Sequence, residues 1–380
     1  MTDTLNARSM SLHRPSTHVD YPLALGLVVL GFFGAFMSYS STRVALANAG
    51  YNPHYYLERQ GFFVILGIAA MAIVAHIDYR RLEILATPLY VGSFFALAGV
   101  FVIGKSALGA QRWYSFGFIQ IQPSEFTVLF IILAVATFCS RRSDGLRMYD
   151  VVRLLLMAGA PLGLIVLQPD LGTSIIIVLV VAGMMVVAGI PPRFMTFLTI
   201  VGTAGLVAAV YLDLLKKYQV ERFTSFVNQN SNNPAIAALL YEVHNAKSAI
   251  GAGGLWGAGV FNGLQTVLGF VPEQRTDFIF TAIGEQLGFV GAASVILLLA
   301  FIAWRMWVIG RHAKDAMGRL LSIGIFIFFS FSVFENIGMT MGIMPVTGIP
   351  LPLLSYGGSA ALVFYTAGGL VLSVSRRLGN

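Results

Sequence analysis

The sequence predicts an all-α polytopic membrane protein with ten transmembrane helices. Of its 380 residues, 57% are hydrophobic and 11% are charged, whereas a soluble domain averages about 25% charged residues. Apolar runs of about 20 residues, the length that crosses a bilayer, recur along the chain. Lys and Arg residues gather in alternate connections between these runs, which is the pattern that sets membrane orientation.

Each predicted span is an apolar run bounded by polar residues, Gly or Pro. The ten spans are 22–40, 60–77, 85–103, 124–140, 154–167, 172–190, 194–213, 278–304, 320–343 and 354–374. The span 154–167 is the weakest, because it is short, contains Pro161 and ends at a Gln-Pro-Asp sequence. The first run is too long for a signal-peptide core and lacks a convincing cleavage site, so we expect it to be retained.

The distribution of basic residues predicts that both termini are cytoplasmic. With the N-terminus inside, fifteen of the 24 Lys and Arg residues fall in inner segments, and five of the other nine lie in one long outer loop. Long loops count little in this rule, so the short loops decide the orientation. The formal net charge of +7 is then a topology signal, and no nucleic acid is expected as a partner. We expect a cytoplasmic tail at 1–21 and a single membrane domain at 22–376, and the single cysteine, Cys139, excludes an internal disulfide.

A large extracytoplasmic loop, residues 214–277, connects the seventh and eighth spans. Loops of this length are usually functional or disordered. Asn233-Pro234 is typical of a helix start, and Gly251 can end the helix. Apolar residues recur between them at near-helical spacing: Ile236, Leu240, Val243 and Ile250. We expect an amphipathic helix on the outer membrane surface. The Gly-rich segment 251–263 fits a backbone nest for phosphates or a tight loop against the membrane, and its spacing favours the tight loop.

The segment 272–292 leads from polar residues directly into the eighth span. If it is helical, Asp277, Thr281, Glu285 and Gly288 share one face. A carboxylate at the membrane surface above a small polar stripe is a candidate site for chemistry. Glu285 lies about 12 Å further along the helix, so we expect it to support the bundle.

Polar residues at three other places are open to a structural or a functional interpretation. Glu125 lies near a positive helix start and Asp170 fits an N-cap, so capping explains both without a ligand. The pair Glu335-Asn336 lies inside the ninth span, where an ionised group costs about 3 kcal/mol. It either lines a cavity or forms a structural polar pair.

Irregular and aromatic segments complete the outer face. Three prolines within 345–352 forbid a regular helix. Trp113, in the loop 104–122, is either an interfacial anchor or part of a site. The sequence contains no HExxH, Walker or Cys/His motif, so a dedicated transition-metal site is not expected. These features favour an outward-facing site of carboxylates and a few cations.

The segment 336–360, NIGMTMGIMPVTGIPLPLLSYGGSA, resembles the C-terminal signature of the SEDS family, the RodA, FtsW and SpoVE proteins of bacterial wall growth. Four further motifs resemble the family in its order: QPSE at 122–125, QPDLGTS at 168–174, KSAIGAGGLWG at 247–257 and PEQRTDFIF at 272–280. The form of QPDLGTS and the Lys247 loop are more like RodA than FtsW. The resemblance covers the chain from about residue 22 onward.

The resemblance implies a peptidoglycan glycosyltransferase of the bacterial cytoplasmic membrane that polymerises lipid II during cell elongation. Asp277 would be the base that activates the 4-hydroxyl of the acceptor GlcNAc, which attacks the donor MurNAc with inversion. Residues assigned to substrate binding are Arg112, Trp113, Glu125, Asp170, Lys247, Glu273, Arg275, Thr276 and Ser355. Glu285, Glu335 and Asn336 are assigned to the structure or the cavity. A class B penicillin-binding protein and membrane lipids are the implied partners. A divalent cation, Mg²⁺ or Mn²⁺, is compatible but not firmly implied.

Two departures from the family pattern affect these assignments. Val128 stands where many relatives carry a Lys able to pair with Glu125. Arg275 stands where His is common, and we hypothesise that its charge keeps Asp277 ionised. The alternatives to the polymerase are a flippase or transporter for lipid-linked precursors, a scaffold for division proteins, and an FtsW-like role in division. Transporters often show repeated halves, and the sequence shows no internal repeat.

Overall fold

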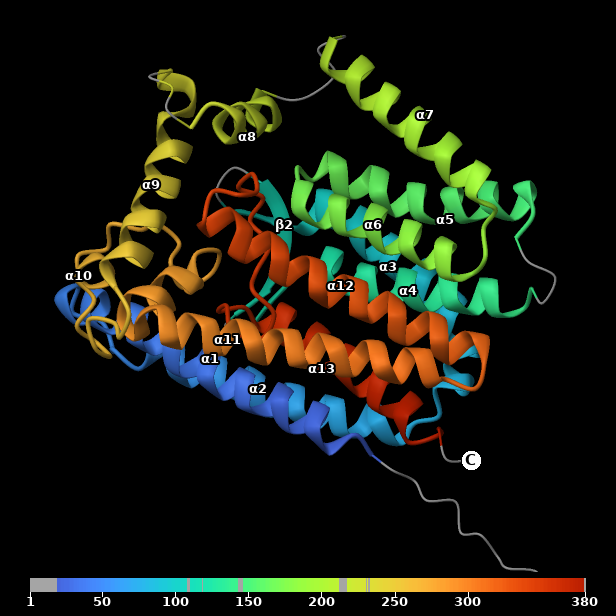
Figure 1. Cartoon of the computed structure of the whole chain (residues 1–380), viewed down its shortest axis with the longest axis horizontal. Helices are drawn as coiled ribbons and strands as arrows, with labels where there is room; N and C mark the ends of the chain where they lie inside the picture. The colour runs from blue at the N-terminus through green and yellow to red at the C-terminus, as the bar shows by residue number, and fades with distance from the viewer. Residues whose placement is uncertain are drawn as a thin grey trace, which may run out of the picture.

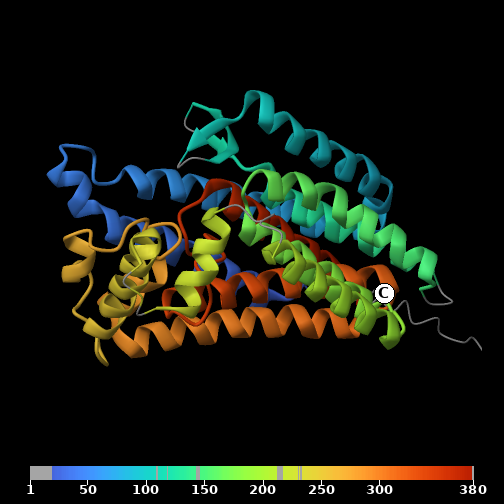
Figure 2. The same ribbon diagram turned by 90° about the horizontal axis from the view of Figure 1, so that it is seen from above.

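Long apolar helices run side by side through most of the chain (Figures 1 and 2). The computed structural model describes residues 19–107, 110–117, 119–142, 146–211, 217–229, 231 and 233–378. The start of the first helix and the end of the last lie at one end of the bundle, on the right in Figure 1. Three short helices, α8, α9 and α10, gather at the opposite end. The predicted tail lies outside the described residues up to residue 18.

Ten helices correspond in order to the ten predicted spans. They are α1 (Tyr21–Asn48), α2 (Tyr55–His76), α3 (Leu82–Ile103), α4 (Pro123–Ser140), α5 (Met148–Leu167), α6 (Leu171–Val187), α7 (Pro192–Tyr211), α11 (Ile279–His312), α12 (Ala316–Thr340) and α13 (Gly358–Ser375). Within the described residues, eight helices are long and apolar enough to cross a membrane, with η1 (Tyr79–Arg81) joined to α3. The 17-residue α6 is shorter, and α7 is not among the eight. A span count of ten, and cytoplasmic termini, stay predictions.

The fifth helix begins earlier than its apolar run predicted. It starts at Met148, and its first turn is capped by Asp150, whose carboxylate accepts the N–H of Arg147 at 3.1 Å and the Nε–H of Arg142 at 2.6 Å. Charged residues in the first turns lower the hydropathy there, so the apolar pattern alone did not predict this start. The helix continues through Pro161 and reaches 20 residues, so the expectation of a short span was wrong.

A small antiparallel sheet corrects the expectation of a purely helical protein. Its strands are β1 (Lys105–Ala107), β2 (Ala110–Phe116) and β3 (Ile119–Ile121), in the order β1-β2-β3. Trp113 lies opposite Lys105, and Tyr114 lies opposite Ile121. The aromatic residues that suggested interfacial anchoring also have high strand propensity. Strand β2 packs against α3 and α4.

The long loop is largely ordered into helices where the structure describes it. They are α8 (Lys217–Val227), η2 (Pro234–Ile236), α9 (Ala237–Ala252) and α10 (Leu264–Val267). The predicted helix is confirmed, while its place on the membrane surface stays a prediction. Asn233 Oδ1 accepts the N–H of Ala235 at 3.0 Å, and α9 buries Leu240 and Val243 against its neighbours. It packs on α11 and α12. Helix α8 was not predicted, and loop residues 214–216 lie outside the described part.

Helix α11 breaks at Gly288, where φ is 66° and ψ is −167°. The Gly-rich segment packs into this break: Ala258 N–H donates to the Glu285 carbonyl at 2.9 Å, and Phe289 N–H donates to the Gly254 carbonyl at 2.8 Å. The N–H of Gly259 donates to the Gln286 carbonyl at 3.1 Å. These amides are used within the fold, which confirms the tight loop rather than a phosphate nest. The predicted continuous helical face ends at the break.

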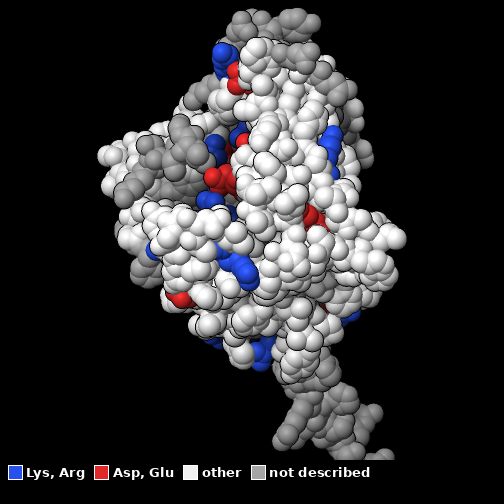
Figure 3. Space-filling view, turned by 90° about the vertical axis from the view of Figure 1, so that its left-hand side faces the viewer, with Lys and Arg blue, Asp and Glu red and all other residues white. Residues whose placement is uncertain are grey.

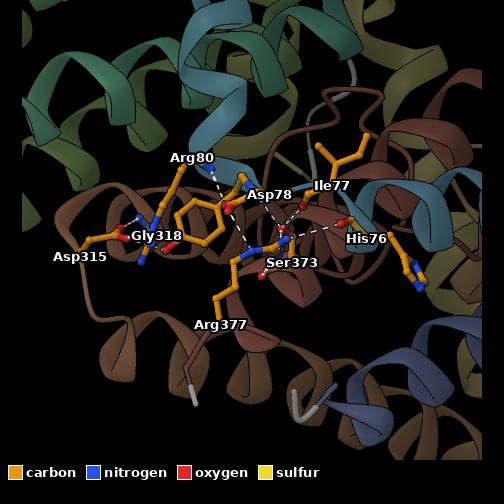
Figure 4. Close-up of polar contacts among 9 residues, drawn as sticks. His76, Ile77, Asp78, Arg80, Asp315, Gly318, Ser373 and Arg377 are labelled. Carbon is orange, nitrogen blue, oxygen red and sulfur yellow. Dashed lines mark hydrogen bonds and ion pairs between the residues drawn. The ribbon is translucent and has the colours of Figure 1, made fainter. Parts of the chain in front are cut away.

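A polar network ties the helix ends together at the end of the bundle that holds the termini (Figure 4). Asp315 accepts the Tyr79 hydroxyl at 2.6 Å and the Nε–H of Arg80 at 2.9 Å. Arg377 lies 3.2 Å from Asp78 in an ion pair. The turn between α2 and α3 is therefore connected to the start of α12 and the end of α13.

Replacing Gly288 by Ala is expected to lower the free energy of unfolding by about 1–3 kcal/mol, because the left-handed backbone at this position disfavours a side chain. An added Cβ would also lie 2.3 Å from the Gly257 nitrogen. Thermal unfolding in detergent measures the change. Gly61→Ala is the matched control, since nothing lies within 4 Å of its Cβ position, and it should be neutral or stabilising. Equal melting temperatures for the two variants would contradict the strained break.

Candidate active site

A cavity of about 510 Å³ lies at the end of the bundle where α8 and α9 gather. Its walls come from α2, β2, α4, α6, α8, α12 and α13 and from the segments around 273–277 and 347–350. Acidic and basic groups lie together in a hollow at this end of the molecule (Figure 3). The sequence-predicted residues that line the cavity are Arg112, Trp113, Glu125, Asp170, Glu273, Arg275, Thr276 and Asp277. The fold thus brings together motifs separated by more than a hundred residues.

Asp277 lies half-buried just before α11, with its carboxylate on the cavity wall. Its N–H donates to the Glu273 carbonyl at 3.1 Å. Its neighbour across the cavity is Gly348, where an added Cβ would lie 3.3 Å from Oδ2. Burial, followed by the charge of Glu273, raises the pKa of Asp277 to about 6, while the charge of Arg222 lowers it. A carboxylate with a pKa near 6 is well suited to act as a base near neutral pH.

Arg222 is a site residue that the sequence reading missed. It lies on α8, lines the cavity, and donates from Nη1 to the Thr347 carbonyl at 2.9 Å. Burial and the nearby positive charge of Arg112 lower the pKa of Arg222. Both arginines line the same cavity. The sequence signal that could have found α8 is an i,i+4 pair, Lys217 and Glu221, which lie 3.9 Å apart.

Arg275 does not have the role that was hypothesised for it. It forms an ion pair with Glu273 at 3.3 Å, and its guanidinium lies 5.0 Å from the ring centre of Tyr56. The charges acting on Asp277 come from other groups, first among the cations Arg222. The guanidinium of Arg275 is instead engaged by Glu273 and the Tyr56 ring. Glu273 itself has a left-handed φ of 46°.

Asp170 connects the starts of helices α4 and α6. Its Oδ2 accepts Gln122 Nε2 at 3.0 Å, Ser124 Oγ at 3.0 Å and Thr173 Oγ1 at 2.9 Å, and its Oδ1 accepts the N–H of Thr173 at 3.2 Å. The predicted N-cap is therefore confirmed. These four hydrogen bonds join the start of α4 to the start of α6 at the cavity wall.

Glu125 lines the same wall, yet its Oε2 is buried and has no hydrogen-bond partner among the described residues. Val128 lies on the cavity wall beside it. The replacement of the family's Lys by Val128 therefore leaves Glu125 without a basic partner in the described chain. A buried carboxyl oxygen that lacks a partner is available to a polar group of a ligand.

Arg112 extends from β2 to the turn before α6. Its Nε–H donates to the Gln168 carbonyl at 2.9 Å, and its Nη2 donates to the Pro169 carbonyl. Carbonyl oxygens orient the guanidinium without neutralising its charge. Arg59, from α2, is held similarly over the Tyr55 ring at 4.1 Å. Among the described residues, neither these two arginines nor Arg222 forms an ion pair with a carboxylate.

The Glu335-Asn336 pair is a structural support beneath the cavity. Asn336 Nδ2 donates to the Asp277 carbonyl and to the Ile349 carbonyl, both at 2.8 Å. Glu335 Oε1 accepts the Thr347 hydroxyl at 2.9 Å. Both side chains are fully buried and neither lines the cavity. The structure therefore favours the structural polar pair over a cavity lining.

Two predicted binding residues lie outside the cavity. Lys247 donates to Gln229 Oε1 at 2.6 Å and links α9 to the segment after α8. Ser355 Oγ accepts the N–H of Leu351 at 2.8 Å and closes a turn. The following residues, Tyr356 and Ser359 among them, line the cavity instead. The motif was recognised correctly, but the side chain that faces the cavity depends on how this turn folds.

Glu285 is buried and secures the segment before Asp277, as expected. Its carboxylate accepts the N–H of Gln265 at 2.6 Å, the N–H of Thr266 at 3.0 Å and the Thr266 hydroxyl at 2.6 Å. It therefore caps α10. Gln274 then bridges Thr266 and Thr281 at 3.1 and 3.0 Å.

A metal site made by protein ligands alone is not formed in the described part of the chain, where no three His, Cys, Asp or Glu residues are grouped to hold an ion. Mg²⁺ commonly takes one or two carboxylates together with substrate phosphates. Glu125, Glu273 and Asp277 are the carboxylates on the cavity wall that could contribute in this way, since the Asp170 oxygens are already occupied.

The fold and the site define a helical membrane protein with one cavity lined by several carboxyl groups, Asp277 among them, and several arginines. The family described as "Cell cycle protein", which comprises FtsW, RodA and SpoVE, matches residues 22–380. The chain belongs to this family.

Named relatives resemble the chain along almost its full length. The peptidoglycan glycosyltransferase MrdB of Escherichia coli K12 is 32% identical over 375 residues, which are 98% of this chain and 97% of that protein. The probable peptidoglycan glycosyltransferase FtsW of Trichlorobacter lovleyi is 33% identical over 381 residues, 97% of this chain and 96% of that protein. Sequence identity thus does not separate the two branches.

Solved structures share the fold. The rod shape determining protein RodA of Thermus thermophilus has a TM-score of 0.68 at 28% identity and covers 94% of this chain and 97% of that chain. A chain from work described as "Structural coordination of polymerization and crosslinking by a peptidoglycan synthase complex" has a TM-score of 0.78 at 29% identity, with 95% and 98% covered.

Replacing Glu285 by Leu is expected to destabilise the protein by about 2 kcal/mol or more, because buried donors of α10 lose their acceptor. Glu285→Gln keeps one acceptor oxygen and should cost less. Limited proteolysis of the segment 253–267, read by mass spectrometry, measures the local effect. Unchanged cleavage in the Leu variant would show that the carboxylate does not hold this segment.

Proposed function

We propose that this protein is a peptidoglycan glycosyltransferase that polymerises lipid II at the outer face of the bacterial cytoplasmic membrane. One observation carries the proposal: a single cavity places the Asp277 carboxylate beside arginines of which Arg112 and Arg222 form no ion pair among the described residues. Such a cavity suits a substrate that has both a sugar hydroxyl to deprotonate and a pyrophosphate to bind. Relatives along the full chain that are named peptidoglycan glycosyltransferases support this choice.

Asp277 is the proposed general base. A carboxylate within hydrogen-bond reach of the acceptor GlcNAc 4-hydroxyl takes its proton as the oxygen attacks the anomeric carbon of the donor MurNAc. The bond from that carbon to the undecaprenyl pyrophosphate breaks on the opposite face, so the configuration inverts. A pKa near 6 leaves Asp277 mostly ionised at neutral pH, and burial keeps it a stronger base than an exposed carboxylate.

The arginines of the cavity are proposed to bind the pyrophosphate. Arg112 and Arg222 are oriented by backbone carbonyls, so they need little reorganisation when an anion arrives. Burial, and after it the charge of Arg112, lowers the pKa of Arg222, and a bound anion would relieve the repulsion between the two arginines. Charge that develops on the leaving group therefore meets cations that are already in place.

The cellular setting is proposed as follows. Ten spans with cytoplasmic termini place the cavity on the outer side, where the long loop lies, in agreement with the positive-inside rule. The domain boundaries are those predicted, with a tail at 1–21 and one membrane domain at 22–376. A class B penicillin-binding protein is the proposed partner, supported by the match to a chain of a peptidoglycan synthase complex. Cell elongation is the proposed role, and division, as in FtsW, is its alternative.

Asp277→Asn should reduce glycan polymerisation by at least about 100-fold, the usual contribution of a general base. The purified protein and its transpeptidase partner are given lipid II, and glycan chains are separated on gels. Glu83→Gln, an exposed carboxylate paired with Arg141, is the control and should retain full activity. Wild-type-like polymerisation by Asp277→Asn would defeat the assignment. Lipid flipping without polymerisation by the wild type would favour the transporter.

The pH dependence of the rate should follow the ionisation of Asp277. Activity is expected to rise through about pH 6 and to level off above it, because only the ionised carboxylate accepts the proton. Arg222→Gln removes a charge that lowers the Asp277 pKa, so the rise should move to higher pH, with about threefold or more activity lost at pH 6. Arg275→Gln should move it little. A larger shift of the pH profile in Arg275→Gln than in Arg222→Gln would instead support the hypothesis that Arg275 keeps Asp277 ionised.

A further inference from the structure

A second cavity, of about 780 Å³, lies where α2 and α13 end, away from the end of the bundle where α8 and α9 gather. It is bounded by the last turn of α2, the turn into η1 and the end of α13. One side is apolar and includes Ile73 and Ile77. The other side is polar and includes Asp78, Arg81 and Arg377. An apolar wall that continues into a basic one matches the two parts of a phospholipid.

The position of Arg377 in this cavity is fixed by several contacts (Figure 4). Its Nε lies 3.2 Å from Asp78 Oδ1, and its Nη1 donates to the carbonyl and the hydroxyl of Ser373 at 2.8 and 2.9 Å. Its Nη2 donates to the His76 carbonyl at 3.4 Å. Asp78 also accepts the N–H of Arg80 at 3.0 Å, so the acid that the described part of the chain places on the cavity wall is already engaged.

Arg81 carries the positive charge of this cavity that no carboxylate of the described chain pairs with. Its side chain is exposed and forms no hydrogen bond or ion pair within the part of the chain that the structure describes. The adjacent Arg80 is different, since it is paired with Asp315 at 2.9 Å. With Asp78 compensated by Arg377, the cavity retains one positive charge beside one prearranged guanidinium.

The apolar wall faces away from the protein core. Ile73 is 62% exposed and Ile77 is 38% exposed, and both lie at the end of a helix that is apolar enough to cross a membrane. An acyl chain packed against them would leave its phosphate at the level of Arg81. Basic pockets between helix ends at the membrane surface bind anionic lipid headgroups by this combination.

We propose that this cavity binds the phosphate headgroup of an anionic phospholipid, with Arg81 as the principal contact and Arg377 as a second donor. Arginine suits this ligand because its planar group donates two parallel hydrogen bonds to phosphate oxygens. The site is separate from the polymerase cavity, and the proposal does not depend on the activity assigned to that cavity.

The test measures lipid retention by the full-length protein. The purified chain in a neutral detergent is titrated with phosphatidylglycerol or with phosphatidylcholine of the same acyl chains, and bound lipid is counted by native mass spectrometry. Wild type should retain phosphatidylglycerol more tightly. Arg81→Gln should weaken that retention about fivefold, the effect of one basic residue near the headgroup. Arg81→Lys should keep most of it, and the melting temperature confirms that each variant is folded.

The control is Arg311→Gln, an exposed arginine at the end of α11 that does not line this cavity. It should retain phosphatidylglycerol like the wild type. An equal loss in Arg311→Gln, or no loss in Arg81→Gln, overturns the proposal because the effect would then be general surface charge. Inorganic phosphate is added in a separate arm. If millimolar phosphate displaces the lipid from the wild type, the cavity is a free-phosphate site and the lipid assignment is wrong.

Discussion

The amide of Asn336 joins the two segments that form the active-site wall. A single Nδ2 group donates to the carbonyl of Asp277 and to that of Ile349, and both carbonyls belong to irregular backbone close to a membrane span. Such groups cannot rely on water for hydrogen bonds, and leaving one without a partner costs several kcal/mol. The position of the carboxylate therefore depends on a side chain that never contacts the cavity.

The same requirement explains the other polar groups inside the bundle. Glu285 caps α10, and Glu335 holds Thr347, whose carbonyl orients Arg222. The break at Gly288 gives the Gly-rich loop backbone partners on α11. Each of these groups satisfies a neighbour's unpaired donor or acceptor. As a result, buried polar residues that look like functional candidates in a membrane sequence serve here as supports for a site built beside them.

The charge distribution inside the cavity depends on which ionisable side chains have no partner within the described chain. Asp170 is saturated by four donors, while Glu125 keeps an oxygen without a partner in the described chain. The arginines are oriented by carbonyls and rings rather than by carboxylates. Burial raises the pKa of Asp277, while the charges of Arg222 and Arg112 on the same cavity wall lower it, so the fold sets this pKa by two opposing effects.

The sequence alone determined the membrane class, the helix order, the family and the acid at position 277, because hydropathy, charge asymmetry and motif spacing are local properties. It also predicted the helix after Asn233, whose capping and periodicity lie within a few residues. Only the tertiary structure decided that β2 is a strand, that α8 brings Arg222 into the cavity, and that Arg275 pairs with Glu273 instead of acting on Asp277. Those outcomes depend on contacts between segments far apart in the chain and on the direction of single side chains, which no local pattern contains. The sequence thus predicts a site around Asp277, whereas the fold decides which charged side chains lie close enough to shift the Asp277 pKa.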